Sequence, residues 1–225
     1  MTEPGWAPSD PRAAEEESYR IVRSRIDLSR LPRFSRDVTE RVIQASADFD
    51  YFTDLVCDED SLAAGVAALA AGAPVIADCA MVAAGITNCP VISKIGEPLT
   101  ARLARTAAIS PAAAAVRLAF GEAGPGAVWV VGGTAEALQE ILARRVEAAF
   151  VVGLPVGFVG AAEAKDALRA SGLRSVSNVS EKGGPAVAVA ALSALLAPAS
   201  GGSQPGWAAG VPPGLVEGDW AAGRG

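Results

Sequence analysis

Short runs of β-branched and aromatic residues alternate along the chain with longer, alanine-rich segments whose apolar positions recur at helical spacing. The runs predict strands, and the intervening segments predict helices. Strands are expected at residues 51–56, 74–78, 91–94, 128–132, 149–153 and 174–177. Because alternating strands and helices are typical of βαβ units, the pattern predicts an α/β fold with three layers, α/β/α, around a mostly parallel sheet.

A pair of helices, residues 13–26 and 37–47, is predicted to precede this sheet. Two later helices have a polar residue where a side chain can cap the first backbone N–H groups. Asp58 stands before the apolar periodicity of residues 61–69, and Thr134 stands before the helix that follows the fourth predicted strand. We expect these two residues to begin their helices.

The two ends of the chain lack such periodicity. Residues 1–11 are acidic and contain proline, and residues 197–225 are rich in Gly, Pro, Ala and Ser. These compositions are typical of disordered tails, so one domain is expected over residues 12–196. A chain of 225 residues with 51% hydrophobic side chains is long enough to bury one sizeable core.

The charge balance argues against a nucleic-acid partner. The net charge of −6 arises in residues 1–60, which carry 14 acidic and 8 basic residues, whereas residues 61–225 carry 11 of each. This distribution offers no basic footprint for phosphates. The N-terminus lacks the order of a secretory signal, and glycine and proline interrupt the longest apolar stretch, residues 62–77. We therefore expect a cytoplasmic protein without a membrane segment.

Metal and disulfide chemistry have little support in the sequence. The three cysteines form no Cys-x-x-Cys pair, and the 225 residues include no histidine. We therefore predict neither a disulfide framework nor a metal site.

Four glycine-containing or polar segments follow predicted strands: the residues after Asp78, the turn Gly132-Gly133-Thr134, the loop 154–160, and the pair Gly183-Gly184. In a parallel α/β sheet the carboxyl ends of the strands are where ligands bind. None of the four has the spacing of a dinucleotide or P-loop motif, so nucleotide binding is not indicated. Glycine is also needed simply to turn the chain, and this alternative stays open for each segment alone.

Taken together, these segments resemble the precorrin-8X methylmutase (precorrin isomerase) family. LPVGFVGAAEAK (154–165) is similar to the family's Pro-Val-Gly-Phe-Val segment and the helix after it, and ADCAMVAAGI (77–86) to its Asp-x-x-Met-Val-x-x-Gly-Ile. ESYRIVRSRIDLSRLP (17–32) and KGGPAVAVAALSAL (182–195) support the likeness, which runs over residues 17–196.

The resemblance implies a homodimer with corrinoid pockets near the subunit interface. It implies a reaction that moves a methyl group from C11 to C12 of precorrin-8X or its cobalt-containing equivalent, in cobalamin biosynthesis, without a cofactor. It also implies substrate contacts at the following positions: Ser18, Met81, Gly132, Gly133, Thr134, Pro155, Val156, Gly157, Phe158, Val159, Lys182, Gly183 and Gly184.

The family's proton donor is a histidine, and the matching position here is Gln44, between Ile43 and Ala45. Imidazole can give and recover a proton near neutral pH, whereas a carboxamide can only donate a hydrogen bond. Other differences from the family pattern also disfavour the family's reaction on its polycarboxylate substrate. Ser110 stands where the family has an arginine, and Glu136 and Glu181 add negative charge in segments expected to meet substrate carboxylates.

Another acid could in principle supply the proton. Asp78, with the adjacent Cys79, is the candidate we name after Gln44, because a buried aspartate with a raised pKa can act as a general acid. Asp48, Asp50 and Tyr51 are further titratable groups near the implied pocket. A carboxylate at the rim of a sheet is more often a helix cap or a solvated charge.

Three functions therefore compete. The first is an isomerase that tolerates Gln44 and positions its substrate with the backbone amides of residues 156–160 and 183–184. The second is a divergent paralogue without methylmutase activity, which binds a tetrapyrrole or acts on a different small molecule. The third is a purely structural domain, which the retained glycine-rich loops make the least attractive.

Overall fold

The computed structural model describes residues 11–199 of the chain. Most of the two tails predicted from composition therefore lies outside the described residues. Helix α1 begins at Pro11, and α10 continues to Ala199, past the expected end of the domain at residue 196.

Within the described residues, strands of the predicted pattern pair into a six-stranded sheet in the order β1-β6-β5-β4-β2-β3. The strands are β1 (Leu55–Cys57), β2 (Val75–Ala77), β3 (Val91–Ile92), β4 (Val128–Val131), β5 (Phe150–Gly153) and β6 (Ser175–Asn178). All neighbouring pairs are parallel except β1 with β6, which is antiparallel. The predicted mostly parallel sheet is confirmed.

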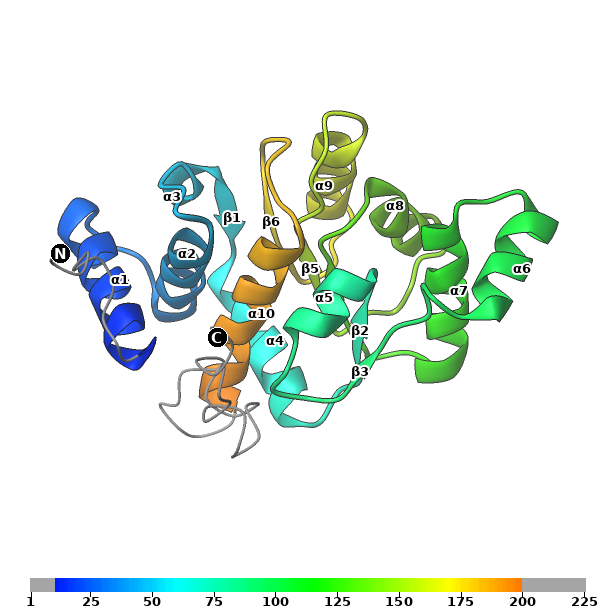
Figure 1. Cartoon of the computed structure of the whole chain (residues 1–225), viewed down its shortest axis with the longest axis horizontal. Helices are drawn as coiled ribbons and strands as arrows, with labels where there is room; N and C mark the ends of the chain where they lie inside the picture. Colours follow the sequence, from blue (N-terminus) through cyan, green and yellow to red (C-terminus); the bar gives the residue numbers. More distant parts are fainter. Residues whose placement is uncertain (1–10, 200–225) are drawn as a thin grey trace, which may run out of the picture.

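Helices cover both faces of this sheet (Figure 1). One face packs against α2 (Arg33–Ser46), α4 (Glu59–Ala70), α5 (Ala80–Gly85) and α10 (Pro185–Ala199). The other packs against α7 (Pro111–Ala123), α8 (Ala135–Ala143) and α9 (Ala161–Ala170), and α6 (Pro98–Ala107) lies on α7. The three-layer α/β/α prediction is therefore confirmed.

The period-2 geometry of β4 explains how one strand serves two cores. Val128 and Val130 belong to the core under α10, whereas Trp129 and Val131 belong to the core under α7 and α8. All four side chains are almost completely buried. Such continuous apolar strands are expected where helices cover both faces of a sheet.

The N-terminal helical pair is also confirmed. Helix α1 (Pro11–Arg25) packs on α2, and α2 packs in turn on α10, so that α1 lies at the edge of the molecule (Figure 1). No helix within residues 11–199 is long and apolar enough to cross a membrane.

The strand predicted at residues 51–56 is largely wrong. Tyr51–Asp54 forms the short helix α3, and only Leu55–Cys57 pairs with β6. The carbonyl oxygen of Asp50 accepts hydrogen bonds from the N–H groups of Thr53 and Asp54, which closes a helical turn. Tyr51 still packs in the core, so its aromatic side chain is buried without the extended backbone that it predicted.

The two predicted helix caps have different outcomes. Asp58 begins α4, and its carboxylate accepts a hydrogen bond of 2.8 Å from the N–H of Ser61, as expected. Thr134 stands at the start of α8, but its side chain makes no capping hydrogen bond. The carboxylate of Asp78, from the end of β2, accepts the N–H of Thr134 instead.

Phe150 allows a direct test of the core. Its side chain is completely buried and lies against Gly65 of α4. We expect Phe150→Ala to lower the free energy of unfolding by about 3–5 kcal/mol, because it leaves a cavity between β5 and α4. Urea denaturation measures the change.

Phe158→Ala is the matched control. Phe158 is 95% exposed, so the same truncation should change the free energy of unfolding by less than about 0.5 kcal/mol. Equal losses in the two variants would contradict the assignment of Phe150 to the core.

Candidate functional site

The carboxyl ends of β2, β4, β5 and β6 meet at one edge of the sheet, because these strands are parallel. The segments that follow them are Asp78-Cys79, Gly132-Gly133-Thr134, the β5–α9 loop (residues 154–160) and the β6–α10 loop (residues 179–184). Figure 1 shows the last two loops at the top of the molecule. The structure thus brings the four predicted strand-end segments to one edge, which we call the carboxyl edge.

Asp78 joins two of these segments. It is 5% exposed, and its carboxylate accepts hydrogen bonds from the N–H groups of Gly132 (3.1 Å), Gly133 (2.8 Å) and Thr134 (3.3 Å). Burial raises the pKa of Asp78, although the three amides act in the opposite direction. Asp78 therefore holds the β4–α8 turn against the end of β2, and the three amides favour its ionised form, whereas a proton donor must be protonated.

The β5–α9 and β6–α10 loops are joined by two backbone hydrogen bonds. The N–H of Gly184 donates to the carbonyl of Leu154 (2.8 Å), and the N–H of Gly157 donates to the carbonyl of Glu181 (3.1 Å). These two amides are therefore occupied within the protein. Positioning of a substrate by backbone amides of residues 156–160 and 183–184 stays a prediction, to which Gly157 and Gly184 have no unbonded N–H to contribute.

Gly183 makes this approach of the two loops possible. A Cβ atom on Gly183 would lie 2.4 Å from the carbonyl oxygen of Leu154 and 2.6 Å from that of Pro155, both closer than real contacts allow. Its φ of +150° also disfavours any side chain. The Gly183-Gly184 pair is therefore required by the packing of one loop on the other.

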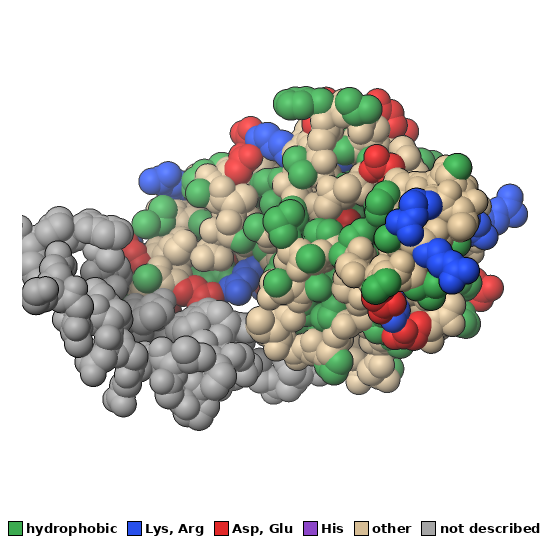
Figure 2. Space-filling view, turned by 45° about the vertical axis from the view of Figure 1, so that its right-hand side comes forward, with side chains coloured by type: hydrophobic (Ala, Val, Ile, Leu, Met, Phe, Trp, Pro, Cys, Tyr) green, Lys and Arg blue, Asp and Glu red, His purple; other side chains and the backbone are tan. Residues whose placement is uncertain are grey.

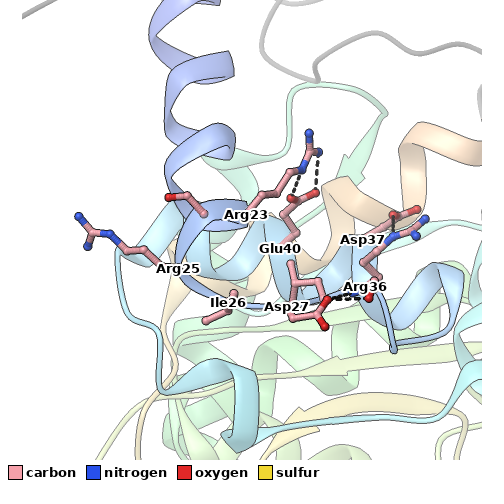
Figure 3. A pocket seen from close by; sticks show the side chains of 10 residues that line it. Arg23, Arg25, Ile26, Asp27, Arg36, Asp37 and Glu40 are labelled. Carbon is pink, nitrogen blue, oxygen red and sulfur yellow. Dashed lines mark hydrogen bonds and ion pairs between the residues drawn. The ribbon is translucent and has the colours of Figure 1, made fainter.

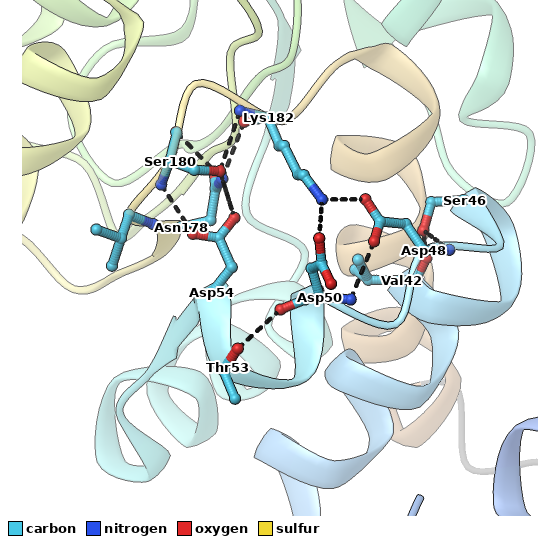
Figure 4. Close-up of polar contacts among 10 residues, drawn as sticks. Val42, Ser46, Asp48, Asp50, Thr53, Asp54, Asn178, Ser180 and Lys182 are labelled. Atoms are coloured by element: carbon cyan, nitrogen blue, oxygen red, sulfur yellow. Dashed lines mark hydrogen bonds and ion pairs between the residues drawn. The ribbon is translucent and has the colours of Figure 1, made fainter. Parts of the chain in front are cut away.

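Asp54, at the end of α3, anchors the start of the β6–α10 loop (Figure 4). Its carboxylate accepts hydrogen bonds from the N–H groups of Val179 (3.1 Å) and Ser180 (2.8 Å), the Ser180 hydroxyl (2.7 Å) and the Asn178 amide (2.8 Å). Burial acts to raise the pKa of Asp54, but these hydrogen bonds outweigh it and leave the pKa below its ordinary value. Neutralising Asp54 should therefore loosen the loop.

Lys182 extends from the same loop toward the end of α2. Its ammonium lies 2.6 Å from a carboxylate oxygen of Asp48 and 2.6 Å from one of Asp50 (Figure 4). The hydrogen bond from Lys182 lowers the pKa of Asp48, and those to the two aspartates raise the pKa of Lys182. Gln44 is half-buried near the C-terminal end of α2, four residues before Asp48 in the sequence.

Large apolar side chains are exposed at the carboxyl edge. Phe158 and Val159 are 95% and 91% exposed, and Met81 and Val156 are 68% and 47% exposed. Figure 2 shows hydrophobic side chains along the uppermost part of the molecule, where these loops lie. Exposed apolar side chains on adjacent loops form a surface suited to a ligand or a partner protein.

Tyr51 and Cys79, two further titratable candidates, favour their protonated forms. Burial, followed by the nearby charges of Asp48 and Asp54, raises the pKa of Tyr51 to about 12. Burial also raises the pKa of the Cys79 thiol. Among the described residues, no group of three or more His, Cys, Asp or Glu side chains could hold a metal ion.

Ser18 is not brought to the carboxyl edge of its own chain, because it lies on α1, which packs on α2. A cavity of about 740 Å³ opens nearby, between the end of α1 and the start of α2 (Figure 3). Ion pairs of Arg23 with Glu40 and of Arg36 with Asp37 partly neutralise its wall. None of the predicted site residues lines this cavity.

Sequence reasoning missed three residues that hold the carboxyl edge together: Asp54, Asn178 and Lys165. Lys165 is the last residue of the segment 154–165 that resembles the family, and the sequence holds no other signal for it. Asp54 and Asn178 stand far apart in the sequence, and only the antiparallel pairing of β1 with β6 brings them together.

Comparisons with known proteins place the sequence and the fold among precorrin-8X methylmutases. A family model described as precorrin-8X methylmutase matches residues 13–198. The chain is 34% identical to a precorrin-8X methylmutase from Sinorhizobium sp. over 201 residues, which cover 84% of this chain and 95% of that protein. It is also 34% identical to a cobalt-precorrin-8 methylmutase from Methanocaldococcus jannaschii over 80% of this chain and 90% of that one.

A solved structure of similar fold is the precorrin-8X methylmutase from Thermus thermophilus. It superimposes with a TM-score of 0.76 at 34% identity and covers 86% of this chain and 98% of its own. A second, described as a precorrin-8X methylmutase related protein, has a TM-score of 0.70 at 26% identity.

Gly183 and Gly157 provide a test of the loop contact, because both have φ of +150° but only Gly183 is crowded. Gly183→Ala should lower the free energy of unfolding by about 1–3 kcal/mol more than Gly157→Ala, since the new methyl group forces the two loops apart. Urea denaturation of both variants gives the difference. Equal effects would show that strain at φ alone, and not the contact with Leu154 and Pro155, requires glycine.

Asp54 generates a prediction about pH. Its pKa in the folded protein lies below the ordinary value of 3.8, so its stabilising contribution is complete above that value and is lost as pH falls through the folded pKa. Asp54→Asn should lower the free energy of unfolding by about 1–3 kcal/mol at pH 7, and its deficit relative to the unmodified protein should shrink in acid. Urea titrations across this pH range measure the deficit.

Asp166→Asn serves as the control, because the side chain of Asp166 is 82% exposed. The free energy of unfolding of Asp166→Asn should stay close to that of the unmodified protein at every pH. A deficit for Asp54→Asn that stays constant down to the lowest pH would contradict the role of the ionised carboxylate.

Proposed function

We propose that this chain, which belongs to the precorrin-8X methylmutase family, is an isomerase of cobalamin biosynthesis. The proposed reaction moves a methyl group from C11 to C12 of precorrin-8X or of its cobalt-containing counterpart. The observation that carries the proposal is the carboxyl edge, where two interlocked loops expose apolar side chains beside Lys182. Such a surface suits a large conjugated ring with carboxylates at its periphery.

Apolar and charged groups have separate tasks in this proposal. Val156, Phe158, Val159 and Met81 offer apolar area for the face of the macrocycle. Lys182 offers an ammonium to a peripheral carboxylate, in competition with Asp48 and Asp50. Since Gly157 and Gly184 use their amides between the loops, the loops contribute shape more than hydrogen bonds.

The reaction is a rearrangement in which the bond from C11 to the methyl carbon breaks and the bond from C12 to that carbon forms. A proton lent to the conjugated ring lowers the barrier and is returned at the end. Gln44 stands at the position of the family's histidine and can donate a hydrogen bond, but it cannot transfer a proton at neutral pH. Positioning and polarisation by Gln44 would then have to carry the reaction.

Asp78 remains the second candidate acid. Its buried carboxyl has a raised pKa, which suits a proton donor, but its oxygens already bind three amides of the β4–α8 turn. We therefore place Gln44 before Asp78 as the group that polarises the ring.

A homodimer, which the family resemblance implies, would explain the position of Ser18. On its own chain Ser18 lies on the peripheral helix α1, away from the carboxyl edge. In a dimer with the site near the interface, α1 of one subunit would supply Ser18 to the site of the other. We further propose that the protein acts in the cytoplasm, as an enzyme of small-molecule biosynthesis.

The test is conversion of precorrin-8X by the purified protein, followed by the spectrum of the product hydrogenobyrinate. The unmodified protein should convert it slowly, and Gln44→His should raise the rate by about 10²–10⁴-fold, the usual contribution of general-acid catalysis. Gln44→Leu is the matched control, which removes the hydrogen-bond donor and should lower the rate further.

Absence of any conversion at stoichiometric protein would overturn the proposal. Tight binding of hydrogenobyrinate without turnover would then favour the alternative of a divergent paralogue that binds a tetrapyrrole. No binding of the ring at all would favour a different small-molecule substrate.

A further inference from the structure

Lys165, on α9, is a buried ammonium that contacts no carboxylate among residues 11–199. Its side chain is 0% exposed. The Nζ atom donates to the side-chain oxygen of Asn178 (2.8 Å) and to the backbone carbonyls of Ser180 (2.5 Å) and Lys182 (2.8 Å). An ammonium has three protons, so this oxygen cage accounts for all of its donors.

Such a group is costly to bury. Burial lowers the pKa of Lys165 to about 8, while Asp54 and Glu181 act to raise it and Arg169 acts to lower it. Buried charges in proteins are usually paired, because neutral oxygens compensate only part of the lost hydration. A methionine of similar length would fill the space without that cost, so the packing of α9 does not explain the residue.

All three acceptors belong to one segment, residues 178–182, at the end of β6 and the start of the β6–α10 loop. The amide group of Asn178 adds a hydrogen bond to the carbonyl of Lys182 (2.9 Å), so the segment is curled around the ammonium. Helix α9 itself begins directly after the β5–α9 loop. Lys165 therefore links the helix after one loop to the backbone of the other.

We propose that Lys165 is a positioning residue that fixes the β6–α10 loop, and through it Lys182, Gly183 and Gly184, in the shape that receives the substrate. It acts through the backbone and does not touch the substrate. The inference rests on the proposed function for the identity of that substrate, a tetrapyrrole polycarboxylate. The fixing of the loop itself can be measured without any ligand.

The test compares Lys165→Met with Arg169→Met. Arg169 lies on the same helix and donates hydrogen bonds to the Ser177 hydroxyl (3.2 Å) and the Asn178 carbonyl (2.8 Å), but to no atom of residues 179–184. Each variant thus loses a cation and its hydrogen bonds from α9 to the end of β6. Hydrogen exchange measured by mass spectrometry reports the protection of peptides spanning residues 178–184 and of the central strands β4 and β5.

Lys165→Met should lower the protection of residues 178–184 by about tenfold or more, since a hydrogen bond to a charged group contributes about 1.5–3 kcal/mol. The strands β4 and β5 should keep their protection. In Arg169→Met the loop should stay protected. Unchanged protection of residues 178–184 in Lys165→Met would overturn the proposal.

A second readout uses the ring itself. In Lys165→Met the affinity for hydrogenobyrinate should fall by about tenfold, and turnover should show a raised KM with kcat changed much less. A loss in kcat at unchanged KM would contradict a positioning role. Failure of the unmodified protein to bind the ring would refute the proposed function and leave the exchange result to decide the role of Lys165.

The role is local to one loop, so the variants are expected to fold. Lys165→Gln, which keeps two donors, should show an intermediate loss of protection. If both Lys165→Met and Lys165→Gln failed to fold, Lys165 would be a global stabilising residue, and the proposal would be wrong.

Discussion

The contact of Gly183 with the carbonyl groups of Leu154 and Pro155 determines the shape of the carboxyl edge. No other residue fits there, because a Cβ atom would lie 2.4 Å from one of these oxygens. The close approach lets the N–H of Gly184 bond to the carbonyl of Leu154 and the N–H of Gly157 bond to the carbonyl of Glu181, the residue before Lys182. Asp54 and Lys165 then hold the far side of the same loop. The candidate site therefore depends on the contact of Gly183 with the β5–α9 loop and on the polar groups of Asp54 and Lys165 that hold the β6–α10 loop in place.

Most of the sheet could be predicted from the sequence, because its parallel strands are buried on both faces and read as apolar runs. Residues 128–132 and 149–153 differ from the observed strands by one residue at one end. The strand predicted at residues 51–56 was largely wrong. Tyr51 is an aromatic residue of a type that favours strands, but the carbonyl of Asp50 accepts the hydrogen bonds that close a helical turn there. A sequence predicts that an aromatic side chain such as that of Tyr51 is buried, but it does not predict which backbone conformation buries it.

The candidate site was only partly predictable. The strand-end segments met at one edge, as parallel topology requires, and Asp78 could be singled out as a polar residue after a buried strand. Its partners could not, because its carboxylate binds backbone amides of the β4–α8 turn, which is remote in the sequence. The cage around Lys165 was hidden for the same reason, since two of its three acceptors are backbone carbonyls, which carry no residue-specific signal. Gln44 was found by resemblance alone, and the structure adds only that it is half-buried near the C-terminal end of α2.

In the proposed function the macrocycle binds at the carboxyl edge, which is formed by the loops at residues 154–160 and 179–184. A crystal structure of the protein with hydrogenobyrinate would show where the ring binds. The ring should lie against Val156, Phe158 and Val159, and Lys182 should contact one of its carboxylates. A ring bound in the cavity between α1 and α2, with both loops free of contact, would contradict this proposal.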